Sequence, residues 1–220
     1  MLRHLSATFV CTAFALPALM QPGCSSARIA MGEQFGYAKR EQLVDRVEDA
    51  RAAQTEAKQE FRDALAEFVS VTGITPEGYE AKYEQLRKAY KDSEDSAEKV
   101  SSRIKSVERV ADALFKEWDK ELAQFQSESL RKNSEEQLTR TRASYTTMLS
   151  AMKSAEERMT QVLGRFNDQV LIMKHNLNAR AVSQLTGTVK EIESDVEKLV
   201  KEMEASIAEA DAFIKQMQGT

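Results

Sequence analysis

Apolar side chains recur in alternating steps of four and three residues along nearly all of the chain beyond residue 42, and this spacing limits the fold more than any other feature. Between residues 43 and 71 the positions are Leu43, Val47, Ala50, Gln54, Ala57, Phe61, Ala64, Phe68 and Val71. This spacing puts them on one face of an α-helix and is typical of a coiled-coil seam, with Gln54 as the one polar intruder. Because another helix must cover such a seam, the segment is expected to pack against helical partners.

The same pattern returns in three later segments, at residues 79–125, 138–177 and 182–217. In segment 138–177 the predicted seam passes from Tyr145 to Leu149, and in segment 182–217 it passes from Met203 to Ile207. Helix breakers are scarce, with three prolines and eight glycines in 220 residues. The clearest interruption is at residues 72–78, where Gly73 can form a left-handed cap and Thr75 with Pro76 can begin the next helix. Helices of about 40 to 50 residues would be ~60 to 75 Å long. We therefore predict an all-α fold: an elongated antiparallel helical bundle, or coiled coil, of three to four long helices.

Two other boundaries are less sharply marked. Residues 126–134 hold few seam residues and several capping residues, which predicts a turn. Asn176, Asn178 or Gly187 could mark a hinge between the last two segments, although the apolar period continues almost unbroken and a single long helix is the alternative. The aromatic residues of the second segment are expected to lie in the core or the seam rather than in a ligand cage. They are three tyrosines and the tryptophan at heptad spacing, Tyr79, Tyr83, Tyr90 and Trp118, and the seam is predicted to end at Phe125.

Charge is distributed unevenly among the predicted helices. Residues 128–180 carry nine basic and six acidic residues, whereas the other three segments are net acidic and the whole chain has a formal charge of −4. One interpretation is that the basic helix lies between acidic neighbours. The functional alternative is a surface for anionic ligands such as lipid phosphates or lipopolysaccharide. The residues of that surface would be Arg131, Lys132, Arg140 and Arg142.

The first 24 residues have the organisation of an export signal. Arg3 and His4 precede an apolar run from residue 5 to residue 20, which is too short for a comfortable transmembrane helix. The stretch up to Cys24 resembles a bacterial lipoprotein signal, in which a small residue, here Gly23, precedes a lipidated cysteine. Gln21 departs from the aliphatic residue usual three positions before the cysteine. We predict a signal peptide at residues 1–23, a lipid anchor at Cys24 with a tether to residue 36, and one helical domain at 37–220.

The alternatives to a lipoprotein are ordinary secretion, with cleavage after Ala27 or Ala30, and an uncleaved or cytosolic form. With Ser25 after the cysteine, the lipoprotein class implies the outer membrane. The predicted location is therefore the periplasmic side of the cell envelope, anchored by lipid to the outer membrane, with a soluble periplasmic protein as the alternative.

Groups that commonly carry catalysis are few. The two cysteines are Cys11, inside the apolar run, and Cys24; after signal removal the one histidine left is His175. His175 lies in a distinctive stretch, residues 168–180, but without an accompanying nucleophile or glycine-rich loop we interpret it as part of a helix junction. We predict no enzyme activity, no catalytic residue, no cofactor and no metal site.

Four blocks of sequence carry a family resemblance: residues 43–50, 113–118, 168–180 and 204–214. They resemble a domain-of-unknown-function family of Gram-negative lipoproteins with long coiled-coil helices, some of whose members are labelled "DNA repair ATPase". The resemblance implies neither an activity nor a site. The ATPase label would need a phosphate loop of the form GxxxxGK[ST], and neither Gly164 nor Gly187 begins one.

Three functional hypotheses follow. The first is a non-enzymatic structural, scaffold or adaptor protein of the envelope, held to the membrane by its lipid anchor and bound to an envelope protein or to further copies of itself. The second is a lipid- or lipopolysaccharide-binding protein that uses the basic third helix. The third, a coiled-coil protein associated with DNA repair, is disfavoured because acidic residues alternate with basic ones and no nucleic-acid partner is expected.

Overall fold

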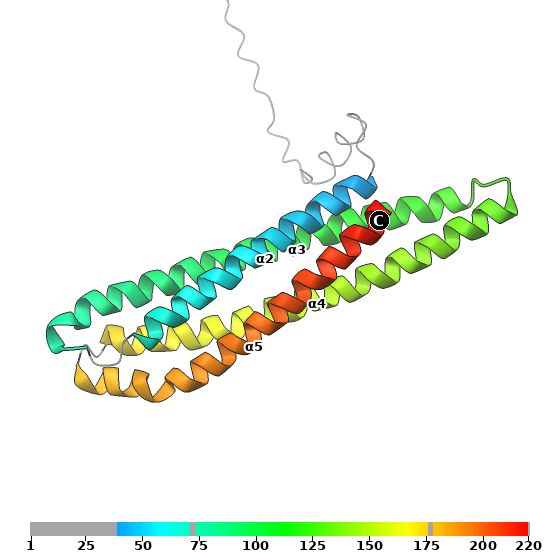
Figure 1. Ribbon diagram of the computed structural model, residues 1–220. Helices are drawn as coiled ribbons and strands as arrows, with labels where there is room; N and C mark the ends of the chain where they lie inside the picture. Colours follow the sequence, from blue (N-terminus) through cyan, green and yellow to red (C-terminus); the bar gives the residue numbers. More distant parts are fainter. Residues whose placement is uncertain (1–38, 71–73, 176–177, 220) are drawn as a thin grey trace, which may run out of the picture.

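The computed structural model describes residues 39–70, 74–175 and 178–219, and helices account for almost all of them (Figure 1). Four of these helices are long: α2 (Lys39–Val69), α3 (Tyr79–Leu122), α4 (Glu128–His175) and α5 (Ala179–Gln218). A 3-10 turn, η1 (Pro76–Gly78), precedes α3. The described part of the chain contains no strand, so the predicted all-α class is confirmed.

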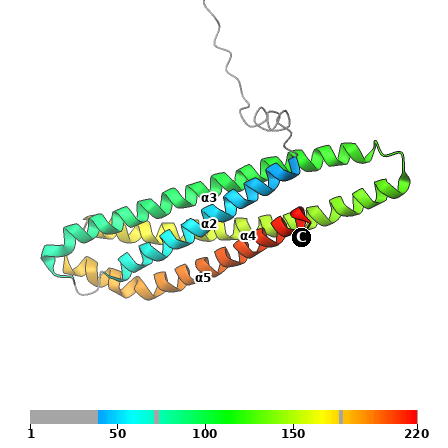
Figure 2. The same ribbon diagram turned by 45° about the horizontal axis from the view of Figure 1, so that its top comes forward.

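The four helices form an elongated up-and-down bundle (Figures 1 and 2). Short connections make each helix antiparallel to the one before it, and α5 returns alongside α2. In cross-section α2 packs on α3 and α5, and α4 packs on the same two helices. Each seam predicted from the sequence therefore faces the common axis of all four helices.

The core is built from the predicted seam positions. All the seam residues of α2 up to Phe68 are buried, and those of the other helices are buried along most of their length. Near one end Phe166 of α4 stacks on Phe68, with ring centroids 4.5 Å apart, and on Phe61 at 6.1 Å. Two seam assignments are wrong in detail. Met148 is fully buried although it was not predicted, and Ser206 is buried where Ile207 was expected, leaving Ile207 only half-buried.

The buried position of Ser206 is explained by Gln54. The Ser206 hydroxyl donates a hydrogen bond of 2.9 Å to Gln54 Oε1 across the contact between α5 and α2. Both side chains are fully buried, so the polar residue in the α2 seam needs a polar partner that an apolar side chain could not supply. The amide nitrogen of Gln54 has no hydrogen-bond partner among the described residues.

The connection between α2 and α3 falls where the sequence predicted it. Gly73 and Val71 lie outside the described residues. Thr75 precedes η1 in an extended conformation, and the Gly78 amide donates to the Thr75 carbonyl at 2.9 Å. A Cβ atom on Gly78 would lie 2.9 Å from Ile74 Cγ2, which explains why glycine occupies this position.

The turn between α3 and α4 is shorter and earlier than predicted. Helix α3 ends at Leu122 and α4 begins at Glu128, so residues 128–134 are helical and Phe125 lies in the connection instead of the seam. Ser127 begins α4: its carbonyl accepts the Arg131 amide at 3.0 Å, and its hydroxyl is 3.4 Å from the Leu130 amide. The capping serine was among the candidates, but the charged residues after it continue the helix.

The chain breaks between α4 and α5 at Asn178, one of the candidate hinges. Helix α4 ends at His175, and Asn178 Oδ1 accepts the Arg180 amide at 3.0 Å at the start of α5. Gly187 lies inside α5, and the alternative of a single long helix is wrong. Asn176 is outside the described residues. An Asx hydrogen bond satisfies an amide that the first turn of a helix leaves unpaired, which is why an asparagine can end an otherwise continuous apolar period.

The basic helix does lie between acidic neighbours. Four cations of α4 form ion pairs with carboxylates of α3 and α5: Arg142 with Asp119 (2.5 Å), Lys153 with Glu108 (3.0 Å), Arg158 with Glu202 (2.9 Å) and Arg165 with Asp195 (2.6 Å). Exposed pairs add little individually to stability, but they favour the antiparallel arrangement over one that brings like charges together. The complementarity predicted from helix charge is thus confirmed.

Candidate functional site

Helices α3 and α4 extend beyond the other two at one end of the bundle, and this hairpin is the most distinctive surface of the molecule (Figures 1 and 2). Lys39, the first residue of α2, pairs with Glu117 of α3 at 2.7 Å, five residues before α3 ends. Near the end of α5, the Ser144 hydroxyl of α4 donates to Gln216. Residues 118–143 therefore form a projecting hairpin, and the α4 portion is about 24 Å long at 1.5 Å per residue.

The base of the projecting hairpin is held by aromatic contacts. Tyr145 of α4 lies edge-on between Phe115 of α3, at 5.3 Å, and Phe213 of α5, at 6.3 Å. The guanidinium of Arg142 lies over the Phe115 ring at 5.3 Å from its centroid, while it pairs with Asp119. Burial, with the nearby carboxylates Glu108 and Asp112, raises the pKa of Tyr145 to about 12. The hydroxyl thus stays neutral and the cluster stays largely apolar.

Further out, the two helices of the hairpin are joined by one side-chain hydrogen bond and by packing. Trp118 Nε1 donates to Ser134 Oγ at 2.9 Å, and Leu138 is buried. The prediction that Trp118 belongs to the seam is confirmed, although its ring is only half-buried because no third helix of residues 39–70, 74–175 and 178–219 covers it. In the hairpin, α3 and α4 thus continue the packing of the bundle core without α2 and α5 beside them.

The four residues proposed as an anionic-ligand surface all lie on the hairpin, but not as one free basic patch. Arg131 pairs with Glu128 at 2.6 Å and with Glu135 at 3.2 Å, and its hydrogen bond lowers the pKa of the Glu128 carboxyl. Arg142 pairs with Asp119. Lys132 and Arg140 are exposed and form no ion pair within the described ranges. They share a helix face with Glu136, which stands between them at helical spacing.

The tip of the hairpin exposes large apolar side chains, and sequence reasoning missed this. Phe125 is 40% exposed and Leu130 is 56% exposed; in the described residues the other large apolar side chain of this kind is Leu171, at 41%. The stretch between Leu122 and Ser127 carries no charge. The missed signal was the absence of seam residues after Phe125, which marked the outer end of the hairpin and not merely a turn.

The other clusters of ionisable groups in the described residues offer no arrangement for catalysis or metal binding. A surface groove between α2 and α3 is lined by Glu60, Asp63, Glu67 and Asp92, but Lys88 pairs with Asp92 at 2.5 Å. Within residues 39–70, 74–175 and 178–219, no three His, Cys, Asp or Glu side chains are placed to hold a metal ion. His175 is exposed at the last position of α4.

The predicted lipidation site, Cys24, lies outside the described residues, as do the signal peptide and the tether. None of the helices in the described part of the chain has an apolar stretch long enough to cross a membrane.

The architecture defines the molecule as an antiparallel four-helix bundle with one projecting helical hairpin. The sequence matches the family described as "Protein of unknown function (DUF2959)" over residues 29–217, and the chain belongs to that family. No curated protein and no solved structure matches it. The match begins ten residues before α2 and ends one residue before the end of α5, so it spans the whole bundle apart from Gln218.

Proposed function

We propose that this chain is a non-enzymatic structural protein of the bacterial cell envelope, anchored by a lipid on Cys24, that serves as a spacer and scaffold or adaptor for an envelope partner. The observation that carries the proposal is that the side chains of the described residues mainly hold the four helices together. Apolar residues fill one continuous core, and charged residues of α4 form ion pairs with carboxylates of α3 and α5. The features that remain available for a function are the length of the bundle, which suits a spacer, and the projecting hairpin, which could bind another molecule.

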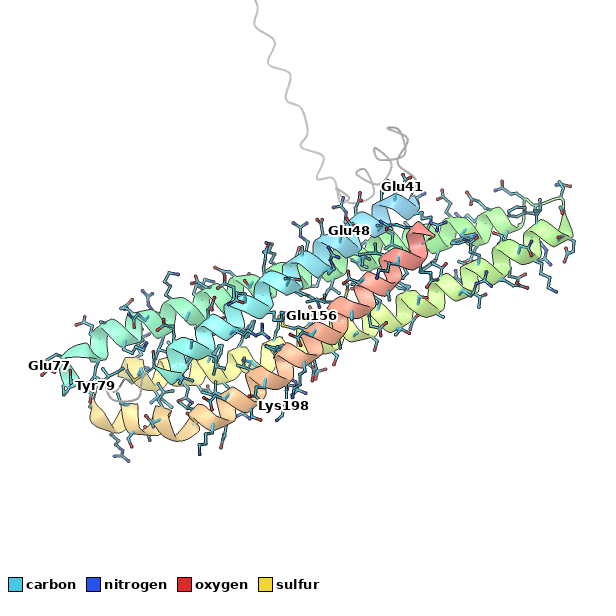
Figure 3. All side chains as sticks on the ribbon, viewed as in Figure 1. Glu41, Glu48, Glu77, Tyr79, Glu156 and Lys198 are labelled. Atoms are coloured by element: carbon cyan, nitrogen blue, oxygen red, sulfur yellow. The ribbon has the colours of Figure 1, made fainter. Side chains whose placement is uncertain are left out.

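The dimensions suit this role. Helix α4 has 48 residues and is ~72 Å long at 1.5 Å per residue. In Figure 3, Glu41 lies near the hairpin end of the bundle, and Glu77 and Tyr79 mark the opposite end. Because the chain enters at the hairpin end, an anchor at Cys24 would hold that end near the membrane and leave the η1 end to reach outward. The two ends would thus be available to different partners.

The ion pairs favour the scaffold over the anion-binding alternative. Arg131 and Arg142, two of the four proposed ligand residues, already bind carboxylates of the same chain. A phosphate would have to displace those partners before it could bind. Lys132 and Arg140 alone would form a weak site that is sensitive to salt.

The anchor is tested by metabolic labelling with an alkyne fatty acid in a bacterial host. We expect label on the wild type and on Cys11→Ser, because Cys11 would leave with the signal, and none on Cys24→Ser. Globomycin, which blocks lipoprotein signal cleavage, should cause the unprocessed chain to accumulate. Absence of label on the wild type, or label kept by Cys24→Ser, would remove the lipid anchor from the proposal. Complementation of a deletion strain, scored by envelope permeability, then tests whether the role needs the anchor.

A further inference from the structure

Two of the three large apolar side chains exposed on the described residues occur together at the tip of the projecting hairpin. Phe125 lies in the connection and Leu130 in the first turn of α4, on either side of Ser127. The residues around Phe125 are small or carry uncharged amides: Ala123, Gln124 and Gln126. The tip thus offers two bulky apolar groups, and around Phe125 little charge would have to be desolvated.

The tip lies at the end of the bundle where the folded chain begins. Lys39 pairs with Glu117, and Arg40 Nε donates to the Met217 carbonyl at 2.9 Å, so α2 starts at the base of the hairpin beside the end of α5. The 15 residues from Cys24 to Lys39 can reach no more than about 54 Å when fully extended. A lipid on Cys24 would therefore keep the tip within reach of the bilayer surface.

We propose that the hairpin tip is a second contact with the membrane, in which Phe125 and Leu130 enter the interfacial region of the lipid bilayer. This rests on the proposed lipid anchor. Two side chains provide far less than the roughly 1,200 Å² that a stable protein interface buries, which argues against a protein or a second copy as the occupant. A lipid surface needs no matching partner, and the anchor supplies the effective concentration that makes a weak contact persist.

The charges near the tip indicate the kind of attraction. Arg131 and Lys132 stand close to Glu128 and Glu135, and both of these carboxylates already bind Arg131. The tip is thus nearly neutral, so the contact depends on apolar burial and not on anionic lipid. With the anchor and the tip both on the bilayer, the bundle would be held by two points at one end, with the η1 end pointing away.

The experiment uses the lipidated protein, purified and reconstituted into vesicles of phosphatidylethanolamine and phosphatidylglycerol. Single cysteines are introduced as Phe125→Cys, Leu130→Cys and Leu171→Cys, and each is labelled with an environment-sensitive fluorophore; Cys24 is blocked by its lipid. Leu171 is the matched control because it is as exposed as Phe125 but lies near the far end of α4. Lipids carrying a quencher in the upper acyl chain report insertion, and vesicle flotation reports anchoring.

We expect a blue shift and quenching at positions 125 and 130 and neither at position 171, unchanged by high salt. Flotation without quenching at positions 125 and 130, or equal quenching at all three positions, overturns the tip contact while leaving the anchor intact. Failure to float overturns the anchor and the tip contact together. Quenching that disappears in high salt would assign the contact to the basic residues of α4. Disulfide cross-linking of position 125 between copies would assign the tip to a second copy instead.

Discussion

The buried pair Gln54 and Ser206 allows a quantitative test of what stabilises the contact between α2 and α5. Gln54 is fully buried; its Oε1 accepts the Ser206 hydroxyl at 2.9 Å, and its Nε2 has no partner among the described residues. A buried donor without a partner costs about 1–3 kcal/mol. Gln54→Leu removes that donor and puts an apolar side chain of similar size in an apolar seam. We therefore expect the substitution to stabilise the protein.

The magnitude follows from opposing contributions. Loss of the neutral hydrogen bond removes about 1 kcal/mol, and removal of the unpaired amide with added apolar burial contributes roughly 2–3 kcal/mol. Ser206 can then rotate its hydroxyl toward the carbonyl one turn earlier in α5, which limits the cost on its side. The net gain is about 1–2 kcal/mol. For a chain of this size each kcal/mol raises Tm by about 2–4 °C.

The assay is urea and thermal unfolding of the unlipidated mature chain, followed by circular dichroism. Gln59→Leu is the control, because it makes the same change at an exposed position of the same helix and should shift stability by less than ~0.5 kcal/mol. Ser206→Ala should have the opposite sign, since it leaves both polar atoms of Gln54 unpaired, and should destabilise by about 1–3 kcal/mol. A destabilising Gln54→Leu, with Gln59→Leu neutral, would refute the reasoning.

Other substitutions test the turn, the core and the base of the hairpin. Gly78→Ala should destabilise by about 1–3 kcal/mol because its Cβ would meet Ile74, whereas Gly164→Ala, in open space within α4, should stabilise by roughly 0.5–1 kcal/mol; urea unfolding measures both. Phe166→Ala should lose about 3–5 kcal/mol in the same assay, since the ring is fully buried in an aromatic stack. Burial raises the pKa of Tyr145 to about 12 from the ordinary 10.0 of a tyrosine, so this residue contributes stability that is complete below pH 10 and is lost as pH rises to about 12. Tyr145→Phe should reduce that loss of stability, and ultraviolet titration of tyrosinate should show one late-titrating group fewer in the variant than in the wild type, where the hydrogen bond to Glu94 also raises the pKa of Tyr90.

Sequence patterns predicted the helices and their core-facing sides well, because both depend on local spacing. The α2 seam was right at every described position, and the turn near Pro76 was right because proline and glycine act on the backbone directly. The end of α4 was harder to predict. An asparagine hydrogen bond interrupts an apolar period that otherwise continues, and the choice between a turn and one long helix depends on whether α5 can fold back on α2, which is a long-range contact.

The burial of Ser206 in place of Ile207 also results from a long-range contact. Ile207 is at the position the heptad predicts, and Ser206 is buried only because Gln54 of a helix 152 residues away needs a hydrogen-bond donor. A polar residue that pairs across a seam fixes the register between two helices at some cost in stability. Gln54 therefore contributes to the register between α2 and α5, which leucine could not do even if it raised stability as predicted. The register of α5 on α2 therefore depends on a contact that neither helix reveals on its own.

The projecting hairpin also depends on long-range contacts that local spacing does not reveal. Phe125 was predicted to lie in the seam, and its exposure at the hairpin tip is the basis of the proposed membrane contact. The seam of α3 continues through Trp118 and Leu122 toward Phe125, but α2 starts level with Glu117 and cannot cover it. A seam pattern predicts that a residue will be buried, but it does not predict which helix or other surface will bury it. Where the described helices end, the apolar residues of the hairpin tip are left exposed. Phe125 and Leu130 are therefore exposed because α2 and α5 do not extend far enough to cover the hairpin tip. The lipid bilayer is the partner that the position of the anchor would supply.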